Sequence, residues 1–127
     1  MDTHAEGAAT PSTGDQQRVQ FSLTTVDELF RGRPLAFAHW DVEGHEERVL
    51  LGAQSTLARD RPYFTVESFP KSARPAHTRL FALARQLNYT PFAFEERVGT
   101  IPDGRNYLCV PDEKVAAFEP HHRAVLK

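Results

Sequence analysis

The sequence predicts an α/β domain built on a mostly parallel sheet, with a terminal antiparallel strand pair. Two continuous apolar runs, LAFAHW and YFTVESF, have the unbroken hydrophobic character of strands that are covered on both faces. Each run is followed by a segment whose apolar residues recur at helical spacing. Strands that alternate with helices of this length pair in parallel through right-handed crossovers. A chain of 127 residues has room for one such domain.

Residues 1–17 are expected to form a disordered tail ahead of a single domain over residues 18–127. The tail has no aromatic or branched aliphatic side chain to bury, so ordering it would cost conformational entropy without return. It also lacks the basic start and apolar core of a signal peptide. No apolar run in the chain approaches the roughly 18 residues that span a bilayer. We therefore expect a cytoplasmic protein without a membrane partner.

Charge and cysteine content exclude further classes of function. The formal net charge is -2 and the isoelectric point is about 6.3, so the chain lacks the basic surplus of a nucleic-acid-binding protein. Cys109 is the single cysteine, which excludes an internal disulfide and a cysteine-based zinc site. Because it lies inside an apolar run, we expect it to be a small core residue.

The domain opens with VQFSL, whose alternating apolar residues indicate a short strand or an extended lead-in, and a short helix follows. Thr25 and Glu28 match a capping box at the start of that helix, and Gly32 and Pro34 end it. The run LAFAHW is the first buried strand. Gly44 ends that strand region, and HEERVLLGAQSTLARD is expected to be one continuous helix because its apolar residues keep helical spacing.

The second part of the domain continues the alternation of strands and helices. YFTVESF is the second buried strand, and a helix is expected over about residues 73–86, with Asn88 as its stop. TPFAFEERV and RNYLCVP are expected to be an antiparallel pair of strands joined through GTIPDG, whose Pro-Asp-Gly favours a turn. One short helix is expected before Pro120.

The apolar residues of these elements define the expected core. Its members are Phe37, Val49, Leu50, Leu57, Phe64, Val66, Leu80, Leu83, Leu87, Phe94 and Leu108.

The stretch HWDVEGHEE places His39, Asp41, Glu43 and His45 on alternate positions. On an extended strand these side chains would share one face, and two imidazoles with two carboxylates would suit a metal ion. The helix that follows Gly44 instead assigns His45 to a turn or a first helical turn, which breaks the alternation. We therefore predict no metal site, and a site made by the other three residues is an alternative that rests on the alternation alone.

In open α/β sheets, ligands bind beyond the carboxyl ends of the strands. Asp41 and Glu43 follow the first buried strand, and Glu67 closes the second. The sequence therefore predicts a carboxylate-lined ligand site at that edge of the sheet. The simpler reading is that these carboxylates bind backbone N–H groups at the start of the next helix, and that His45 is solvated.

Several spaced motifs in this region resemble the carboxyl-terminal half of the FkbM-type methyltransferases. Residues 25–29 resemble the family's TLD-x-L helix start, and DVEGHE resembles its D-x-E-G-x-E after a strand. Residues 50–53 and 61–67 resemble the L-x-G-A helix and the strand that follows Arg-Pro, and NYLCVP resembles the last strand. Two departures are His39, where the family usually has Lys, and Trp40, where it usually has a smaller aliphatic residue.

The resemblance implies a Rossmann-like sheet and transfer of a methyl group from S-adenosylmethionine to a hydroxyl-type oxygen of a small molecule or sugar. It implies that Asp41, Glu43 and His45 are catalytic, and that Asp41, Gly44 and Glu67 face the cofactor. A positioned carboxylate or imidazole would take the proton of the acceptor hydroxyl.

The family's first three strands and their Gly-rich cofactor loop have no counterpart in this sequence, which contains no G-x-G-x-G pattern. We therefore expect an incomplete domain that by itself binds S-adenosylmethionine weakly or not at all. The resemblance also implies that LAFAHW becomes an edge strand, with unpaired backbone groups. The alternative to a methyltransferase is a noncatalytic or remnant half-domain that pairs with another chain through this edge.

Overall fold

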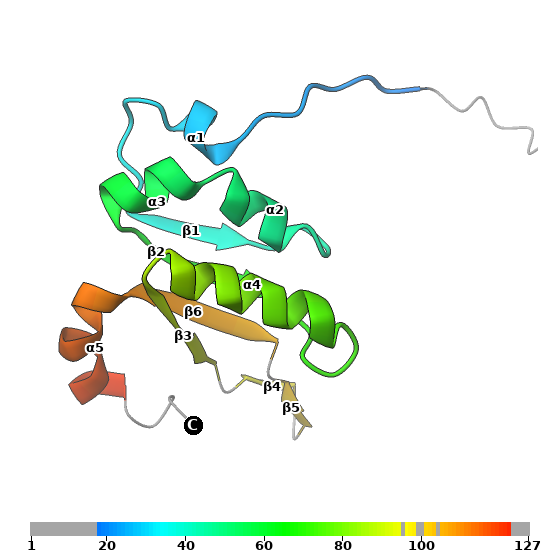
Figure 1. The fold of residues 1–127 in the computed structure, drawn as a ribbon. Helices are drawn as coiled ribbons and strands as arrows, with labels where there is room; N and C mark the ends of the chain where they lie inside the picture. Colours follow the sequence, from blue (N-terminus) through cyan, green and yellow to red (C-terminus); the bar gives the residue numbers. More distant parts are fainter. Residues whose placement is uncertain (1–17, 95, 99–100, 104, 123–127) are drawn as a thin grey trace, which may run out of the picture.

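The computed structural model of the chain describes residues 18–122 apart from residues 95, 99, 100 and 104. The expected tail, residues 1–17, lies outside the described residues. The helices and strands, in chain order, are α1 Val26–Leu29, β1 Phe37–Trp40, α2 Glu46–Leu51, α3 Gln54–Asp60, β2 Tyr63–Glu67, α4 Arg74–Gln86, β3 Tyr89–Ala93, β4 Glu96–Val98, β5 Ile101–Asp103, β6 Asn106–Pro111, the 3-10 turn η1 Asp112–Lys114, and α5 Val115–His122 (Figure 1).

The main sheet is mixed, so the prediction of a mostly parallel sheet is wrong. Its strand order is β1-β2-β6-β3, and of its neighbouring pairs only β1 and β2 are parallel. The reason is that β6 inserts between β2 and β3 and runs opposite to both. The predicted antiparallel pairing of the last two strands is confirmed, with Pro91 opposite Cys109.

The segment TPFAFEERV does not form one strand. Its first part belongs to β3, whereas Glu96–Val98 pairs with Ile101–Asp103 in a separate two-stranded hairpin. In the sequence, this hairpin lies between β3 and β6. The connection between these two strands is therefore longer than the simple turn that was predicted.

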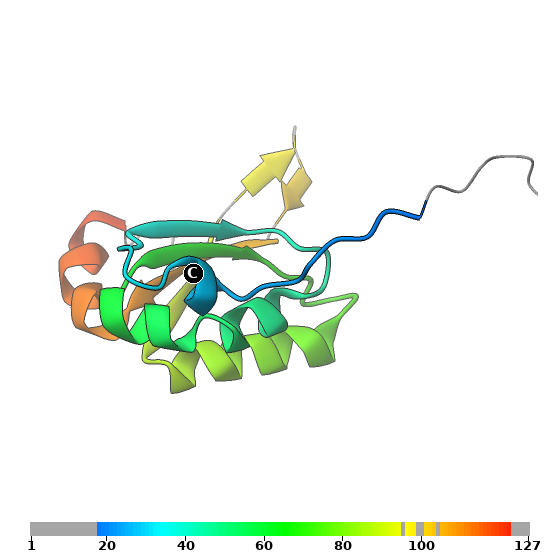
Figure 2. The same cartoon turned by 90° about the horizontal axis from the view of Figure 1, so that it is seen from above.

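The helices cover the sheet unevenly. Helices α2, α3 and α4 lie on one face, and the β4–β5 hairpin projects from the other side (Figures 1 and 2). Helix α5 contacts β3 through the rings of Phe92 and Phe118, whose centroids are 5.2 Å apart. Strand β1 is an edge of the described sheet, as expected. None of the described helices combines the length and the apolar character needed to span a bilayer.

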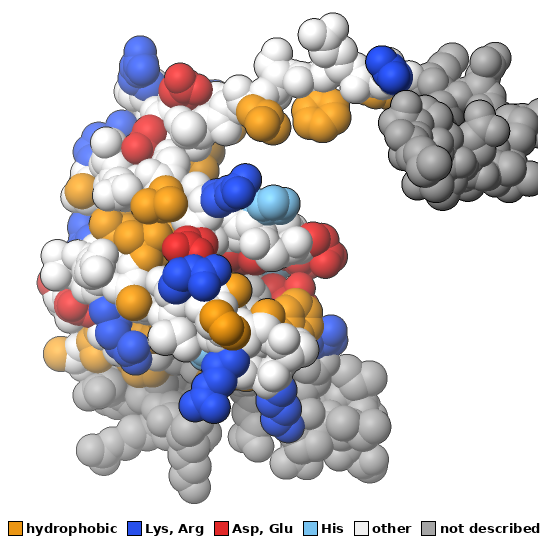
Figure 3. Space-filling model, turned by 45° about the vertical axis from the view of Figure 1, so that its right-hand side comes forward, with side chains coloured by type: hydrophobic (Ala, Val, Ile, Leu, Met, Phe, Trp, Pro, Cys, Tyr) orange, Lys and Arg blue, Asp and Glu red, His pale blue; other side chains and the backbone are white. Residues whose placement is uncertain are grey.

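The lead-in VQFSL is an extended arm that leaves the body of the domain (Figure 1). Its alternating apolar residues Val19, Phe21 and Leu23 are all exposed. A space-filling view shows hydrophobic side chains along this arm, and acidic and basic side chains interspersed on the body (Figure 3).

The capping box predicted at Thr25 is confirmed. The Thr25 hydroxyl accepts a hydrogen bond from the Glu28 amide at 3.2 Å, and the Glu28 carboxylate accepts one from the Thr25 amide at 3.4 Å. The helix that follows β1 is not continuous, however, because it breaks at Gly52 into α2 and α3.

The break lies where α1 contacts Gly52. The Asp27 amide donates to the Gly52 carbonyl at 2.9 Å. A Cβ atom on Gly52 would lie 3.1 Å from the Cβ atom of Thr25, so a larger residue would crowd this contact. The break could not be predicted from local spacing, because the residues that contact Gly52 belong to α1 and its cap, which precede β1 in the sequence.

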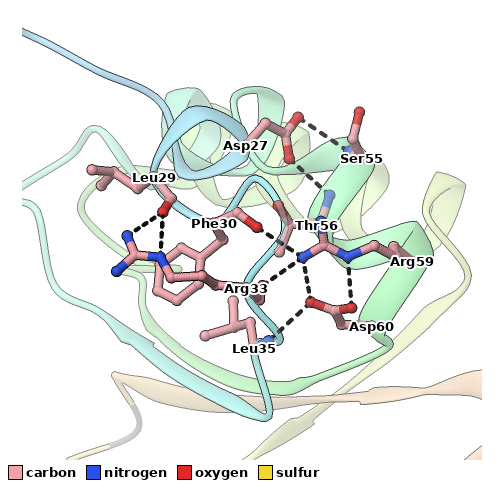
Figure 4. A network of polar contacts seen from close by, with 9 residues as sticks. All are labelled: Asp27, Leu29, Phe30, Arg33, Leu35, Ser55, Thr56, Arg59 and Asp60. Carbon is pink, nitrogen blue, oxygen red and sulfur yellow. Dashed lines mark hydrogen bonds and ion pairs between the residues drawn. The ribbon is translucent and has the colours of Figure 1, made fainter.

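Asp27 also caps helix α3 (Figure 4). Its carboxylate accepts hydrogen bonds from the amides of Ser55, at 3.1 Å, and Thr56, at 2.7 Å. Burial opposes ionisation of Asp27, but these hydrogen bonds outweigh it and hold the pKa of the carboxyl below its usual value. Two of the free amides at the start of α3 are therefore satisfied by a side chain from α1.

A second group of polar contacts lies at the other end of α3 (Figure 4). The Arg59 guanidinium binds both oxygens of Asp60 at 2.7 Å and donates to the carbonyls of Phe30 and Arg33. Asp60 also accepts a hydrogen bond from the Leu35 amide at 2.9 Å. The pair thus fixes the chain between α1 and β1 against α3.

Arg61 connects α3 to the far side of the domain. It has a left-handed φ of 49°, and its guanidinium binds both oxygens of Glu113, at 2.8 and 2.9 Å. It also donates to the carbonyls of Leu87, at 3.0 Å, and Asn88, at 2.7 Å, and lies over the ring of Tyr89. Arg61 therefore satisfies the carbonyls at the end of α4, where Asn88, the predicted stop, has a φ of 60°.

The core forms between the sheet and its three covering helices. The predicted members Leu50, Leu57, Phe64, Val66 and Leu80 are buried, and Val49, Leu83 and Leu87 pack beside them. The core also contains Ala53 and Ala84, together with three residues that were not predicted: Trp40, Phe81 and Tyr89. Cys109 is fully buried, as expected.

The prediction that Phe37 is a core residue is wrong, because its side chain is 55% exposed. Alternation along β1 directs Ala38 and Trp40 to the helix-covered face, and therefore Phe37 and His39 to the opposite face. Trp40 stacks on Phe64 with ring centroids 4.6 Å apart. The run LAFAHW is apolar on both faces although helices cover only one of them.

The cap supplied by Asp27 predicts a stability effect. Asp27→Ala should lower the free energy of unfolding by about 0.5–2 kcal/mol, because two amides of α3 lose their acceptor. Urea unfolding followed by circular dichroism measures this effect. Arg31→Ala, an exposed change just after α1, is the control and should stay within about 0.5 kcal/mol of the parent. Equal effects of the two changes would show that Asp27 is no cap.

Candidate functional site

The carboxyl ends of β1 and β2 meet at one edge of the sheet because the two strands are parallel. Their register places His39 opposite Thr65 and Trp40 opposite Val66. The loop of residues 41–45 leaves β1 at this edge, and Glu67 is the last residue of β2. The candidate site is built from this loop and the end of β2.

The loop after β1 contains two residues with left-handed backbone. Glu43 has a φ of 51° and Gly44 a φ of 95°. A Cβ atom on Gly44 would meet nothing within 4 Å, so Gly44 is required by its backbone conformation and not by space. The left-handed conformation at Glu43 is uncommon for a residue with a side chain, so the loop must be held from outside.

Glu46 supplies that support. Its side chain is buried, and one carboxylate oxygen accepts hydrogen bonds from the amides of Val42, at 3.1 Å, and Gly44, at 3.3 Å. The His45 amide closes the turn by donating to the Val42 carbonyl at 3.3 Å. Glu46 was not among the site residues predicted from the sequence. The signal was present, however, because an acid two residues after a loop glycine is placed to accept amides from the turn before its helix.

The structure brings Asp41 and Glu67 together across the two strand ends. Burial raises the pKa of Glu67, and the neighbouring carboxylate of Asp41 raises it further. Arg105, whose nearest nitrogen is 3.9 Å from the Glu67 carboxylate, acts in the opposite direction. The charge of Glu43 adds a smaller upward effect. The three acids singled out from the sequence therefore lie at one edge of the sheet.

The two histidines have different surroundings. His39 is on β1, and its Nδ1 atom is 2.7 Å from the hydroxyl of Thr65 on the neighbouring strand. His45 is the exposed residue before α2 and makes no capping hydrogen bond with its side chain. It lines a separate, mainly apolar cavity of about 390 Å³ together with Leu23, Val42 and Arg48.

The alternation His39, Asp41, Glu43, His45 does not form one face, because β1 ends at Trp40 and the loop then turns. Across the described ranges, no group of three or more His, Cys, Asp or Glu side chains is arranged to hold a metal ion. Asp41 and Glu43 are exposed carboxylates on a fixed loop, next to a third, partly buried one. Such a group can accept protons and hydrogen bonds, and it attracts cations.

The fold and the site define an α/β domain with a carboxylate-lined edge at the ends of two parallel strands. Within that class, the chain belongs to the FkbM methyltransferase family, since the family's sequence model, described as "Methyltransferase FkbM domain", matches residues 2–91. The match includes α1 through α4 and the start of β3, and it ends before β6. Comparisons with curated proteins and with solved structures gave no match.

The motifs that carry the family resemblance divide into two groups in the structure. Asp27 and Arg61 are structural, since one caps α3 and the other joins α4 to η1. Asp41, Glu43 and Glu67 lie at the strand ends, where their carboxylates face one another or solvent. The second group is therefore the candidate for chemistry.

The hydrogen bonds of Glu46 lead to a prediction about the loop. Glu46→Ala should destabilise the protein by about 1–3 kcal/mol, because two loop amides lose a charged acceptor. It should also speed hydrogen exchange at the amides of Val42 and Gly44. Glu46→Gln, which keeps an acceptor oxygen, should restore most of both properties.

Glu47→Ala is the matched control for this prediction. Glu47 is the next residue on α2 and forms an exposed ion pair with Arg79 at 3.1 Å, so its loss should cost less than about 1 kcal/mol. Unchanged exchange at Val42 and Gly44 in Glu46→Ala would contradict the role of Glu46.

Proposed function

We propose that this chain carries the acceptor side of a methyltransferase that uses S-adenosylmethionine and methylates a hydroxyl-type oxygen of a small molecule or sugar. The observation that carries the proposal is the meeting of Asp41, Glu43 and Glu67 at the ends of β1 and β2 in a chain of the FkbM family. In this proposal the sheet is one part of a Rossmann-like sheet, and β1, the helices α2 and α3, and β2 form one of its crossover units.

The residues at this edge fit the cofactor by their chemistry. Carboxylates accept hydrogen bonds from hydroxyl and ammonium groups, and their negative charge complements a sulfonium cation. Asp41 and Glu67 would hold the cofactor in this way, and Gly44, which has open space in place of a side chain, would leave room beside it. When bound, S-adenosylmethionine supplies a methyl group on a positively charged sulfur that is already activated for transfer.

The protein's own part in the reaction is to orient the acceptor and to take its proton. Asp41 and Glu43 are exposed on a loop that Glu46 fixes, so a hydroxyl approaching the edge meets a preoriented carboxylate. The proton of the hydroxyl passes to one of these two carboxylates as the oxygen gains its methyl group. His45, one residue beyond the turn, is the alternative base.

A methyl-transfer assay tests this function. The chain is incubated with S-adenosylmethionine that carries a tritiated methyl group, at saturating concentration because weak cofactor binding is expected, and with sugars, alcohols and phenols as acceptors. The combined change of Asp41→Asn and Glu43→Gln should lower the rate about a hundredfold or more, because the acceptor loses its base. The two single changes and His45→Gln then show which group takes the proton.

Glu47→Gln is the control, because it removes a carboxylate from the same helix region but not from the site. It should leave the rate within about twofold of the parent, a change worth less than about 0.5 kcal/mol in barrier. Full activity after loss of both Asp41 and Glu43 would contradict the proposal.

A second candidate function is a noncatalytic half-domain that pairs with another chain. The observation in its favour is that β1 is an edge strand of the described sheet and that its first residue, Phe37, is largely exposed. Sedimentation velocity at increasing protein concentration tests self-pairing. Association that Phe37→Lys abolishes would support this candidate, and a monomer at every concentration would contradict self-pairing.

A further inference from the structure

A cavity of about 440 Å³ lies between α4 and the strands β3 and β6. It is separate from the carboxylate edge. Tyr107, one of its lining residues, is opposite Val66, whose side chain lies in the helix-covered core. Glu67 is the next residue along β2, so its side chain points to the other face of the sheet. The proposed methyl-transfer site and this cavity therefore use opposite faces.

Aromatic rings form one wall of the cavity. The rings of His77, Phe81 and Tyr107 contact one another, with centroids 4.6 Å apart for His77 and Phe81, 5.4 Å for His77 and Tyr107, and 4.7 Å for Phe81 and Tyr107. Phe92 of β3 also lines the cavity. This wall suits the flat face of an aromatic ligand, because aromatic rings stack well against each other at such distances.

The cavity contains polar groups that can bind a ligand. The Nδ1 atom of His77 is 2.9 Å from the hydroxyl of Ser68, which is buried, so Nε2 is the ring nitrogen left for a ligand. The Arg85 guanidinium and the Tyr107 hydroxyl make no hydrogen bond or ion pair to any described residue. Burial raises the pKa of Tyr107, which keeps its hydroxyl protonated, and lowers the pKa of His77.

The charge of the residues that line the cavity favours an anionic ligand. Arg85 is the permanently charged residue there, and the described lining contains no Asp or Glu. An unpaired guanidinium binds a carboxylate with two parallel hydrogen bonds, which makes a carboxylate its best small partner. The volume lies within the range of about 300–1,000 Å³ that is usual for small-molecule sites.

We propose that this cavity is a second binding site, which takes a small aromatic carboxylate with its carboxylate on Arg85 and its ring against the wall of His77, Phe81 and Tyr107. The site lies between α4 and the strands β3 and β6, and it functions independently of the proposed methyl transfer.

Titration with benzoate, followed by two-dimensional NMR of the full chain, tests the proposal. The amides of His77, Phe81 and Tyr107 should shift in a saturable way, and those of residues 41–46 should not. Benzamide, which has the same ring without the charge, and inorganic phosphate, which has charge without the ring, should each bind at least about tenfold more weakly, a difference of about 1.4 kcal/mol.

Two arginines of α4 provide a matched pair of variants. Arg85→Gln should weaken benzoate binding at least about tenfold, whereas Arg74→Gln, an exposed change on the same helix outside the cavity, should leave it within about twofold. Three results would each overturn the proposal: no shift at the cavity, equal affinity for benzoate and benzamide, or equal losses in the two variants.

Discussion

The carboxylate of Glu46 is the constraint on which the edge of this domain depends. It accepts two amides from a loop of which two successive residues have left-handed backbone. Without that acceptor, the amides of Val42 and Gly44 would lose their partner inside a tight turn, and the loop would have many conformations. With it, Asp41 is held against Glu67 of the neighbouring strand. The buried Glu46 carboxylate, which takes no part in the proposed chemistry, thus positions the loop that contains Asp41 and Glu43.

Other contacts hold the frame around this edge. Asp27 joins α1 to α3, and Arg61 joins the end of α3 to α4 and to the turn after β6. These contacts keep the helices on one face of the sheet, with the ends of β1 and β2 side by side (Figures 1 and 2). They also explain why a family motif need not mark a catalytic residue. Asp27 and Arg61 lie in motifs as distinctive as DVEG, yet their partners are backbone groups and an ion-pair carboxylate.

Local patterns in the sequence predicted what depends on neighbours along the chain. The capping box at Thr25, the extent of α4 and the stop at Asn88 follow from spacing and propensity alone, and the structure confirms them. The meeting of Asp41 with Glu67 followed from one general rule, that parallel strands bring their carboxyl ends to the same edge. Which of these acids has a role in chemistry remains a prediction.

What the sequence could not predict depends on distant partners. The break at Gly52 is caused by α1, and the partner of Arg61 lies more than fifty residues away, at Glu113. The mixed sheet arises because β6 pairs on both of its edges, which no local pattern of NYLCVP encodes. Phe37 was misplaced because LAFAHW has no alternation, so its faces could be distinguished only by where the helices lie.

The central claim is that the loop after β1 holds the Asp41 carboxylate against that of Glu67. Carbon-13 NMR of the Glu67 side-chain carboxyl during a pH titration measures this directly. The account predicts a Glu67 pKa above the ordinary glutamate value of 4.5, and a lower pKa in Asp41→Asn, because the neighbouring negative charge is removed. A Glu67 pKa at or below the ordinary value, or one that Asp41→Asn leaves unchanged, would contradict it.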